Sequence, residues 1–192
     1  MHKAFAFGAL AALAFTGTAF AENGNGGAMS YDYLEGQYIS ADYDDLPGSN
    51  PDGFGLAGSI GFSPMLHGYV DYDRLSTHGI TIQGVELGLG LNYSVSSNVD
   101  LIGRVGFARA KVENFGSDNG FGVQAGVRAR VVDNVELESL VHYTDFGGSG
   151  GDNTSVKLAG RYFFSPQFSA GIGVELDNDV KLWDAGFRWT FN

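Results

Sequence analysis

The sequence of 192 residues contains no cysteine, four prolines, and eleven lysines and arginines against 22 aspartates and glutamates. The absence of cysteine excludes a disulfide framework. The formal net charge of −11 argues against a nucleic-acid partner, because binding to a phosphate backbone needs a basic surface. After residue 21 no stretch approaches the roughly 18 apolar residues that a transmembrane helix needs. The catalytic patterns H-E-x-x-H, G-x-S-x-G and C-x-x-C are also missing.

The first 21 residues have the three parts of a secretory signal peptide. Lys3 supplies the positive charge, residues 4–15 form a short apolar run, and Ala19-Phe-Ala21 fits the A-x-A cleavage pattern. A membrane-anchoring helix is the alternative, but the apolar run is short for a membrane span. We therefore expect residues 1–21 to be cleaved on export and residues 22–192 to form a single mature domain.

Short turn signals alternate along the mature chain with longer polar segments. The turn signals lie at residues 63–64, 96–98, 133–134 and 165–166, and the polar segments lie near residues 44–52, 76–79, 113–119, 147–153 and 177–179. This alternation is typical of an up-and-down β-barrel with periplasmic turns and extracellular loops. It predicts ten strands near residues 30–43, 53–62, 66–75, 80–93, 99–112, 120–132, 135–146, 154–164, 168–177 and 181–191. An eight-stranded barrel, with one hairpin counted as a loop, is the alternative.

Apolar and polar residues alternate within most of these strands. In residues 120–131, for example, Phe121 and Val123 share one face, whereas Gln124 and Arg128 share the other. A shift of one residue would exchange the two faces, so the register is strongly specified. The alternation is least clear in residues 30–43 and 66–75.

The polar face is too highly charged for the core of a soluble barrel. Eleven charged side chains share it by this alternation: Glu86, Arg104, Arg128, Arg130, Glu136, Glu138, Lys157, Arg161, Glu175, Asp184 and Arg188. Burying so many charges in an apolar core would carry a heavy desolvation cost. The pattern instead predicts an all-β, transmembrane antiparallel barrel with lipid outside and charges inside.

Aromatic residues are placed where the two membrane surfaces would lie. One set flanks the predicted turns (Phe62, Tyr93, Tyr162, Phe164, Trp189, Phe191) and the other flanks the predicted loops (Phe54, Tyr72, Phe107, Phe121, Tyr143, Trp183). Two such girdles are typical of outer-membrane barrels.

The end of the chain carries the pattern polar-x-Gly-x-x-aromatic-x-aromatic at Asp184, Gly186, Trp189 and Phe191. This pattern resembles the assembly signal of Gram-negative outer-membrane proteins, which usually end on the aromatic, whereas Asn192 follows here. Residues 31–36, 87–93 and 124–128 are also similar to a family of small xanthomonad outer-membrane proteins named diffusible-signal proteins. The resemblance implies a small OmpA/OmpX-like barrel that is inserted by the barrel-assembly machinery and carries no catalytic residue.

Charges of both signs in a narrow barrel favour a lumen plugged by ion pairs. Barrels of eight strands are filled by side chains, and ten strands lie near that end of the range. The alternative is an ion-selective pore, because rings of charged side chains also select ions in channels. We expect a small, largely closed barrel with a structural, envelope or surface-interaction role, and a narrow porin-like channel is the alternative.

Two further hypotheses concern the predicted loops. A remote one is an outer-membrane hydrolase, in which Asp71, Asp73 and His78 or His142 would activate water. Salt-bridge partners and solvated loops explain these residues better, and no cofactor is expected.

The second hypothesis is that acidic loops bind divalent cations and contact lipopolysaccharide phosphates. Its residues are Asp42, Asp44, Asp45, Asp52, Asp118, Asp145, Asp152, Asp177 and Asp179, although ordinary solvated loops also fit them. The expected partners are outer-membrane lipid, lipopolysaccharide and the assembly machinery.

Overall fold

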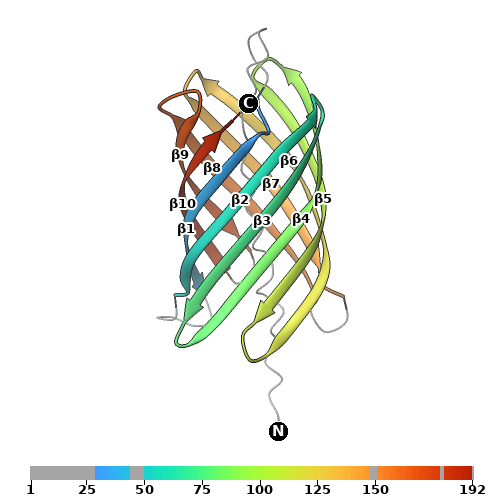
Figure 1. Cartoon of the computed structure of the whole chain (residues 1–192), viewed down its shortest axis with the longest axis vertical. Coiled ribbons are helices and arrows are strands. Elements are labelled where there is room, and N and C mark those ends of the chain that lie inside the picture. Colours follow the sequence, from blue (N-terminus) through green and yellow to red (C-terminus); the bar gives the residue numbers. More distant parts are fainter. Residues whose placement is uncertain (1–28, 44–49, 148–150, 178–179, 192) are drawn as a thin grey trace.

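A computed structural model describes residues 29–43, 50–147, 151–177 and 180–191, which form a closed antiparallel barrel (Figure 1). The ten strands are β1 (Tyr33–Tyr43), β2 (Asp52–Ser63), β3 (Leu66–Thr77), β4 (Ile80–Ser96), β5 (Val99–Val112), β6 (Gly116–Val132), β7 (Val135–Asp145), β8 (Asp152–Phe163), β9 (Phe168–Leu176) and β10 (Val180–Thr190). The prediction of ten strands is confirmed, and the eight-stranded alternative is wrong. The predicted signal peptide lies outside the described residues. No helix in the described part of the chain is long and apolar enough to cross a membrane.

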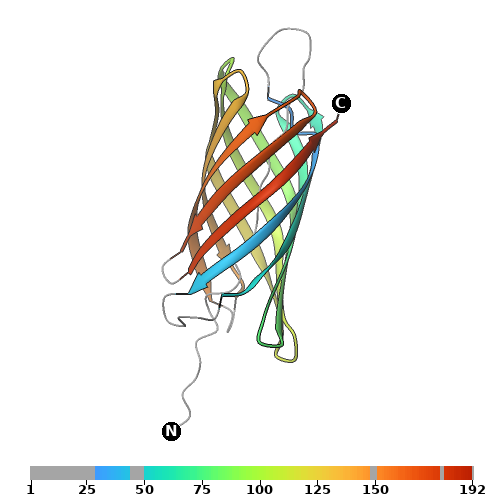
Figure 2. The same ribbon diagram turned by 90° about the vertical axis from the view of Figure 1, so that its left-hand side faces the viewer.

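The barrel closes where the first and last strands pair. Each strand pairs with its neighbours in sequence, and β1 pairs with β10 in a register that places Tyr33 opposite Thr190 (Figure 2). Closure leaves no unpaired strand edge, which is what a sheet needs in a medium without water.

The connections at the two ends of the barrel differ from the predicted lengths. Residues 64–65, 97–98, 133–134 and 164–167 connect strands at one end, called the turn end below; the opposite end is called the loop end. Two predicted loops at the loop end are tight turns. His78 and Gly79 form one of them with φ angles of 46° and 81°, which suit a two-residue hairpin. The other spans only residues 113–115, because β6 begins at Gly116 rather than near residue 120.

The two faces of the strands have opposite character. Apolar side chains point outward, and Ile172 and Phe187 are each 70% exposed. Buried inward positions carry many polar and charged residues, as the alternation predicts. Since a strand alternates its side chains strictly, outward residues meet lipid and inward residues fill the lumen.

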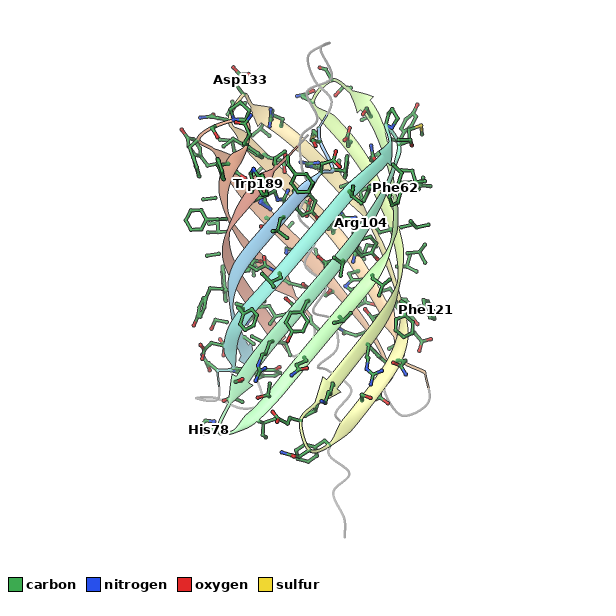
Figure 3. All side chains as sticks on the ribbon, viewed as in Figure 1. Phe62, His78, Arg104, Phe121, Asp133 and Trp189 are labelled. Atoms are coloured by element: carbon green, nitrogen blue, oxygen red, sulfur yellow. The ribbon has the colours of Figure 1, made fainter. Side chains whose placement is uncertain are left out.

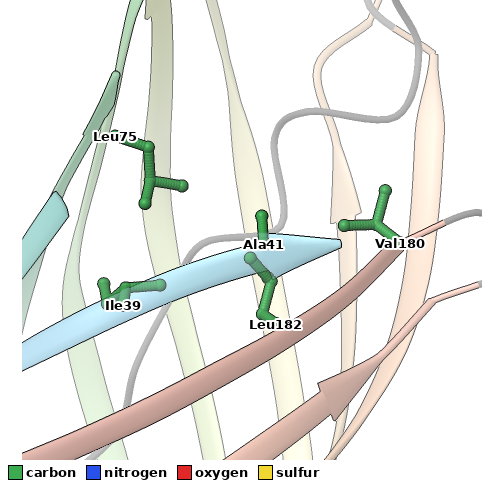
Figure 4. Packing of buried hydrophobic residues seen from close by; sticks show 5 residues of the cluster. All are labelled: Ile39, Ala41, Leu75, Val180 and Leu182. Atoms are coloured by element: carbon green, nitrogen blue, oxygen red, sulfur yellow. The ribbon is translucent and has the colours of Figure 1, made fainter. Parts of the chain in front are cut away.

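Apolar side chains also enter the lumen near the loop end. Ile39 and Ala41 from β1, Leu75 from β3, and Val180 and Leu182 from β10 form a buried cluster (Figure 4). These inward apolar residues explain why the alternation of β1 and β3 is weak in the sequence.

The aromatic side chains lie toward both ends of the outer wall. Phe62 and Trp189 lie toward the end that carries Asp133, and Phe121 lies toward the end that carries His78 (Figure 3). Phe121 also contacts Tyr143, with ring centroids 6.3 Å apart. These labelled side chains therefore lie toward the ends that the two predicted girdles assign to them.

Candidate functional site

The lumen collects the charged residues singled out in the sequence. Glu86, Arg104, Arg128, Glu136, Glu138, Lys157, Glu175 and Arg188 are buried there, and Arg130, Arg161 and Asp184 are half-buried. They come from the seven consecutive strands β4 to β10, so what each side chain can do depends on its contacts across the lumen.

A chain of ion pairs runs around half of the turn end. Glu35 of β1 accepts hydrogen bonds from Arg188 Nε of β10 at 2.9 Å and from Arg161 Nη1 of β8 at 3.2 Å. Arg161 Nε also lies 4.0 Å from Glu136 of β7, which pairs with Arg128 of β6 at 2.8 Å. Shared carboxylates satisfy several buried cations at once, which offsets the cost of taking them out of water.

The residues before β1 fold into the lumen instead of extending the strand. Tyr31 donates a hydrogen bond to Asp100 of β5 at 3.0 Å and stacks on His67 of β3, with ring centroids 4.5 Å apart. The guanidinium carbon of Arg128 lies 5.2 Å from the centre of the Tyr31 ring, and its Nη1 donates to the Ser30 carbonyl at 3.4 Å. The sequence predicted a strand from residue 30. In the structure β1 begins at Tyr33, and the segment before it covers the turn end of the lumen.

Glu86 is the centre of a second network, deeper in the lumen. It accepts hydrogen bonds from the Tyr69 hydroxyl at 2.6 Å and from Gln124 Nε2 at 3.2 Å. Its other oxygen lies 3.2 Å from His142 Nε2. These four side chains come from β3, β4, β6 and β7, so the network reaches across the lumen. Gly122 makes room for it, because a Cβ at that position would collide with the Glu86 carboxylate.

The loop half of the lumen is acidic. Asp71 and Asp73 of β3 are each 1% exposed, and their carboxylate oxygens have no hydrogen-bond partner among the described residues. Asp184 lies 3.6 Å from Lys157, and Glu175 accepts a hydrogen bond from Ser155. The arginines therefore gather toward the turn end, and carboxylates without hydrogen-bond partners among the described residues lie farther along the axis.

The residues of the hydrolase hypothesis are not brought together. His78 is exposed on the β3–β4 turn and contacts Thr77, whereas Asp71 and Asp73 are buried in the lumen. His142 contacts Glu86 and Thr144 inside the barrel. Among the described residues, the geometry thus lacks the rim cluster of acids and histidine that water activation would require.

The divalent-cation hypothesis is only partly covered by the structure. Among the residues it describes, no group of three or more histidine and acidic side chains is arranged to hold a metal ion. Asp44, Asp45 and Asp179 of that hypothesis lie outside the described residues.

A closed antiparallel barrel with an apolar outer wall and a charged interior defines an outer-membrane β-barrel protein. Residues 6–164 match the model of one family, described as the outer membrane protein beta-barrel domain, and the chain belongs to this family. The family places the protein in the outer membrane. The comparison with curated proteins found no significant match.

Several solved structures share the fold at low sequence identity. An outer membrane channel from Pseudomonas putida F1 is 12% identical, with 89% of this chain and 100% of that chain covered and a TM-score of 0.50. The outer membrane protein OprG from Pseudomonas aeruginosa is 13% identical, with 87% and 98% covered and a TM-score of 0.47. The KdgM porin is 10% identical, with 82% and 99% covered and a TM-score of 0.46. These likenesses concern the fold alone, and the narrower resemblance to the xanthomonad family stays a prediction.

Proposed function

We propose that this protein is a largely closed outer-membrane barrel with a structural or surface-interaction role in the envelope and no catalytic activity. The observation that carries the proposal is the contact between Arg128 and the Ser30–Tyr31 segment. In a barrel of ten strands β6 lies opposite β1, so this contact spans the lumen. A solute entering from the turn end would have to displace it.

The apolar cluster at the loop end supports the same proposal. Leu75 of β3 packs with Ile39 and Ala41 of β1 and with two residues of β10. Apolar constrictions in a narrow pore exclude water and thereby block ions. A polar plug at one end and an apolar constriction at the other both oppose conduction.

The experiment is a conductance measurement on the purified, refolded barrel in planar bilayers. Slower migration of the boiled than the unboiled sample on a gel first verifies that the barrel is folded. We expect no steady unitary openings from the unaltered protein, and steady openings of one size would refute the closed barrel. Insertion is verified separately by digesting reconstituted vesicles with a protease, since an uninserted protein would also be silent.

A narrow cation channel is the second candidate, and Asp71 and Asp73 favour it. Both carboxylates are buried without a hydrogen-bond partner among the described residues, an arrangement that attracts cations. If the barrel conducts, the reversal potential in a potassium chloride gradient should show cation selectivity. Asp71→Asn with Asp73→Asn should then reduce that selectivity, whereas unchanged selectivity would contradict a role for these residues.

We also propose export through the periplasm and insertion by the barrel-assembly machinery. The last strand supports this, because Trp189 is outward and 48% exposed while Gly186 is inward and buried. Machinery that reads the end of a strand from the lipid side could therefore reach the Trp189 ring.

A further inference from the structure

The cationic side chains of the described residues fall into two groups. Six point into the lumen: Arg104, Arg128, Arg130, Lys157, Arg161 and Arg188. The other four, Arg74, Arg109, Lys111 and Lys181, point outward, and all of them lie near the loop end. Within the described ranges no lysine or arginine points outward at the turn end. Most of the outer wall between the two ends is apolar, and its outward cations are confined to the loop end, where exposed acids such as Asp42 and Glu113 also lie.

Three of the outward cations are close neighbours. Arg74 of β3 is paired in register with Gln83 of β4, and Gln83 is paired with Lys111 of β5. Arg109 lies two residues before Lys111 on the same face of the strand. Adjacent strands are about 4.8 Å apart and two residues span about 6.7 Å, so the three Cα atoms lie within roughly 12 Å of one another.

Among the described residues, no acidic side chain is ion-paired with this trio. Arg109 Nη2 donates a hydrogen bond to the Ser117 hydroxyl at 3.0 Å. In the described part of the chain, no Asp or Glu forms an ion pair with Arg74, Arg109 or Lys111. The sequence has twice as many acids as bases, yet among the described residues none of these acids is ion-paired with the three cations. The patch is therefore available to an anion outside the protein.

The trio also stands at a defined height on the outer wall. Tyr72 precedes Arg74 by two residues on the same face of β3, and Phe107 precedes Arg109 in the same way on β5. Farther from the loop end, Val70 and Val105 are exposed and apolar. Aromatic rings prefer the headgroup level of a membrane, and long cationic side chains extend beyond it toward charged groups. Toward the loop end, each of the two strands therefore carries a valine, then an aromatic residue, then an arginine. This order matches the layers of a membrane, which pass from the hydrocarbon core through the interface to the phosphate groups.

We propose that Arg74, Arg109 and Lys111 form a binding site for the phosphate groups of a lipid in the outer leaflet. The trio lies just beyond the aromatic girdle on a wall that is already covered by lipid. The anion that meets it is therefore the headgroup of a lipid. The inference deepens the proposed envelope role and rests on it, together with the expectation from the sequence that the loop end faces the cell exterior. It also differs from the hypothesis of acidic loops, because direct contact between cations and phosphate needs no bridging metal.

The test uses native mass spectrometry of the folded barrel in detergent, titrated with diphosphorylated lipid A. The triple variant Arg74→Gln, Arg109→Gln and Lys111→Gln keeps polar side chains at all three positions. We expect it to bind the lipid about 100-fold more weakly. Each cation near an anionic surface strengthens binding about fivefold, and three such factors multiply to about 100. Lys111→Gln alone should weaken binding about fivefold. The matched control Lys181→Gln removes an outward cation at the same end of the barrel, from β10, and should have little effect.

Two further arms identify the source of the phosphate. Lipid A stripped of its phosphates should bind the unaltered protein and the triple variant equally, and inorganic phosphate at millimolar concentration should not displace the lipid. Equal affinity of the two proteins for diphosphorylated lipid A would overturn the proposal, and so would an equally large loss in Lys181→Gln. Displacement by inorganic phosphate would also overturn it, because the site would then take free phosphate. Conductance of the same preparation is a separate readout, so openings would refute the closed barrel without changing the lipid titration.

Discussion

Glu35 and Arg188 lie directly opposite each other on β1 and β10, the strands that close the barrel, and form a buried ion pair in the lumen. The guanidinium of Arg188 also lies over the ring of Tyr33, 4.1 Å from its centre. The seam between the two ends of the chain is therefore held by side chains as well as by strand pairing.

Glu35→Gln should destabilise the barrel by about 3–5 kcal/mol, because it leaves the buried Arg188 and the half-buried Arg161 near a neutral partner. The double variant Glu35→Gln with Arg188→Met should recover part of this loss, since it removes the uncompensated charge as well. Urea unfolding of the refolded barrel in lipid vesicles measures both. A loss below 1 kcal/mol in the single variant would mean that water or other groups solvate Arg188.

Gly122→Val should destabilise the barrel by about 1–3 kcal/mol, because its side chain would compete with the Glu86 carboxylate for the same space. Gly103 provides a matched control: it points outward, and a Cβ there meets nothing within 4 Å. Gly103→Val should leave the unfolding midpoint nearly unchanged. Equal unfolding midpoints for the two variants would show that the lumen beside Glu86 has space for the valine side chain.

Removal of both closures should make the barrel conduct. Tyr31→Ala opens the turn end and Leu75→Ser hydrates the loop end, but either change alone leaves the other closure in place. We expect steady openings in planar bilayers only from the double variant. Tyr38→Ala, which removes an outward aromatic ring from β1, is the control and should stay silent. If Tyr31→Ala alone conducts, the apolar cluster is not a barrier.

The proposed assembly signal can be separated from general lipid contact. Trp189 belongs to the terminal pattern, whereas the neighbouring outward residue Phe187 does not, although it is 70% exposed. Trp189→Ala should slow folding by purified assembly machinery more than Phe187→Ala does, as followed by the heat-modifiable fraction on gels. Equal rates would assign both residues only to the lipid-facing wall.

Much of the barrel could be predicted because its rules are local. Strand boundaries depend on turn-forming residues, and the predicted boundaries lie within four residues of those in the structure, as at Gly116. The inward placement of Arg128 and Glu138 follows from a period of two along each strand. Even the weak alternation of β1 has a local cause, namely the inward Ile39 and Ala41.

The contacts inside the lumen could not be predicted in the same way. Arg161 reaches Glu35 across 126 residues of sequence, and Arg128 reaches Ser30 across 98. Such pairs depend on how far the strands are staggered when the sheet closes, which no single strand encodes. Nothing in the sequence indicated that residues 29–31 would turn into the lumen.

The sequence by itself determined the two faces of the strands and the membrane that surrounds them, and it favoured ten strands over eight, because alternation and turns are properties of neighbouring residues. Only the tertiary structure decided that Ser30 and Tyr31 contact Arg128 inside the lumen, that five apolar side chains cluster near its loop end, and that Arg74, Arg109 and Lys111 share one patch of the outer wall. These features arise from the register between strands, which is fixed when the barrel closes and brings together side chains that are distant in the chain.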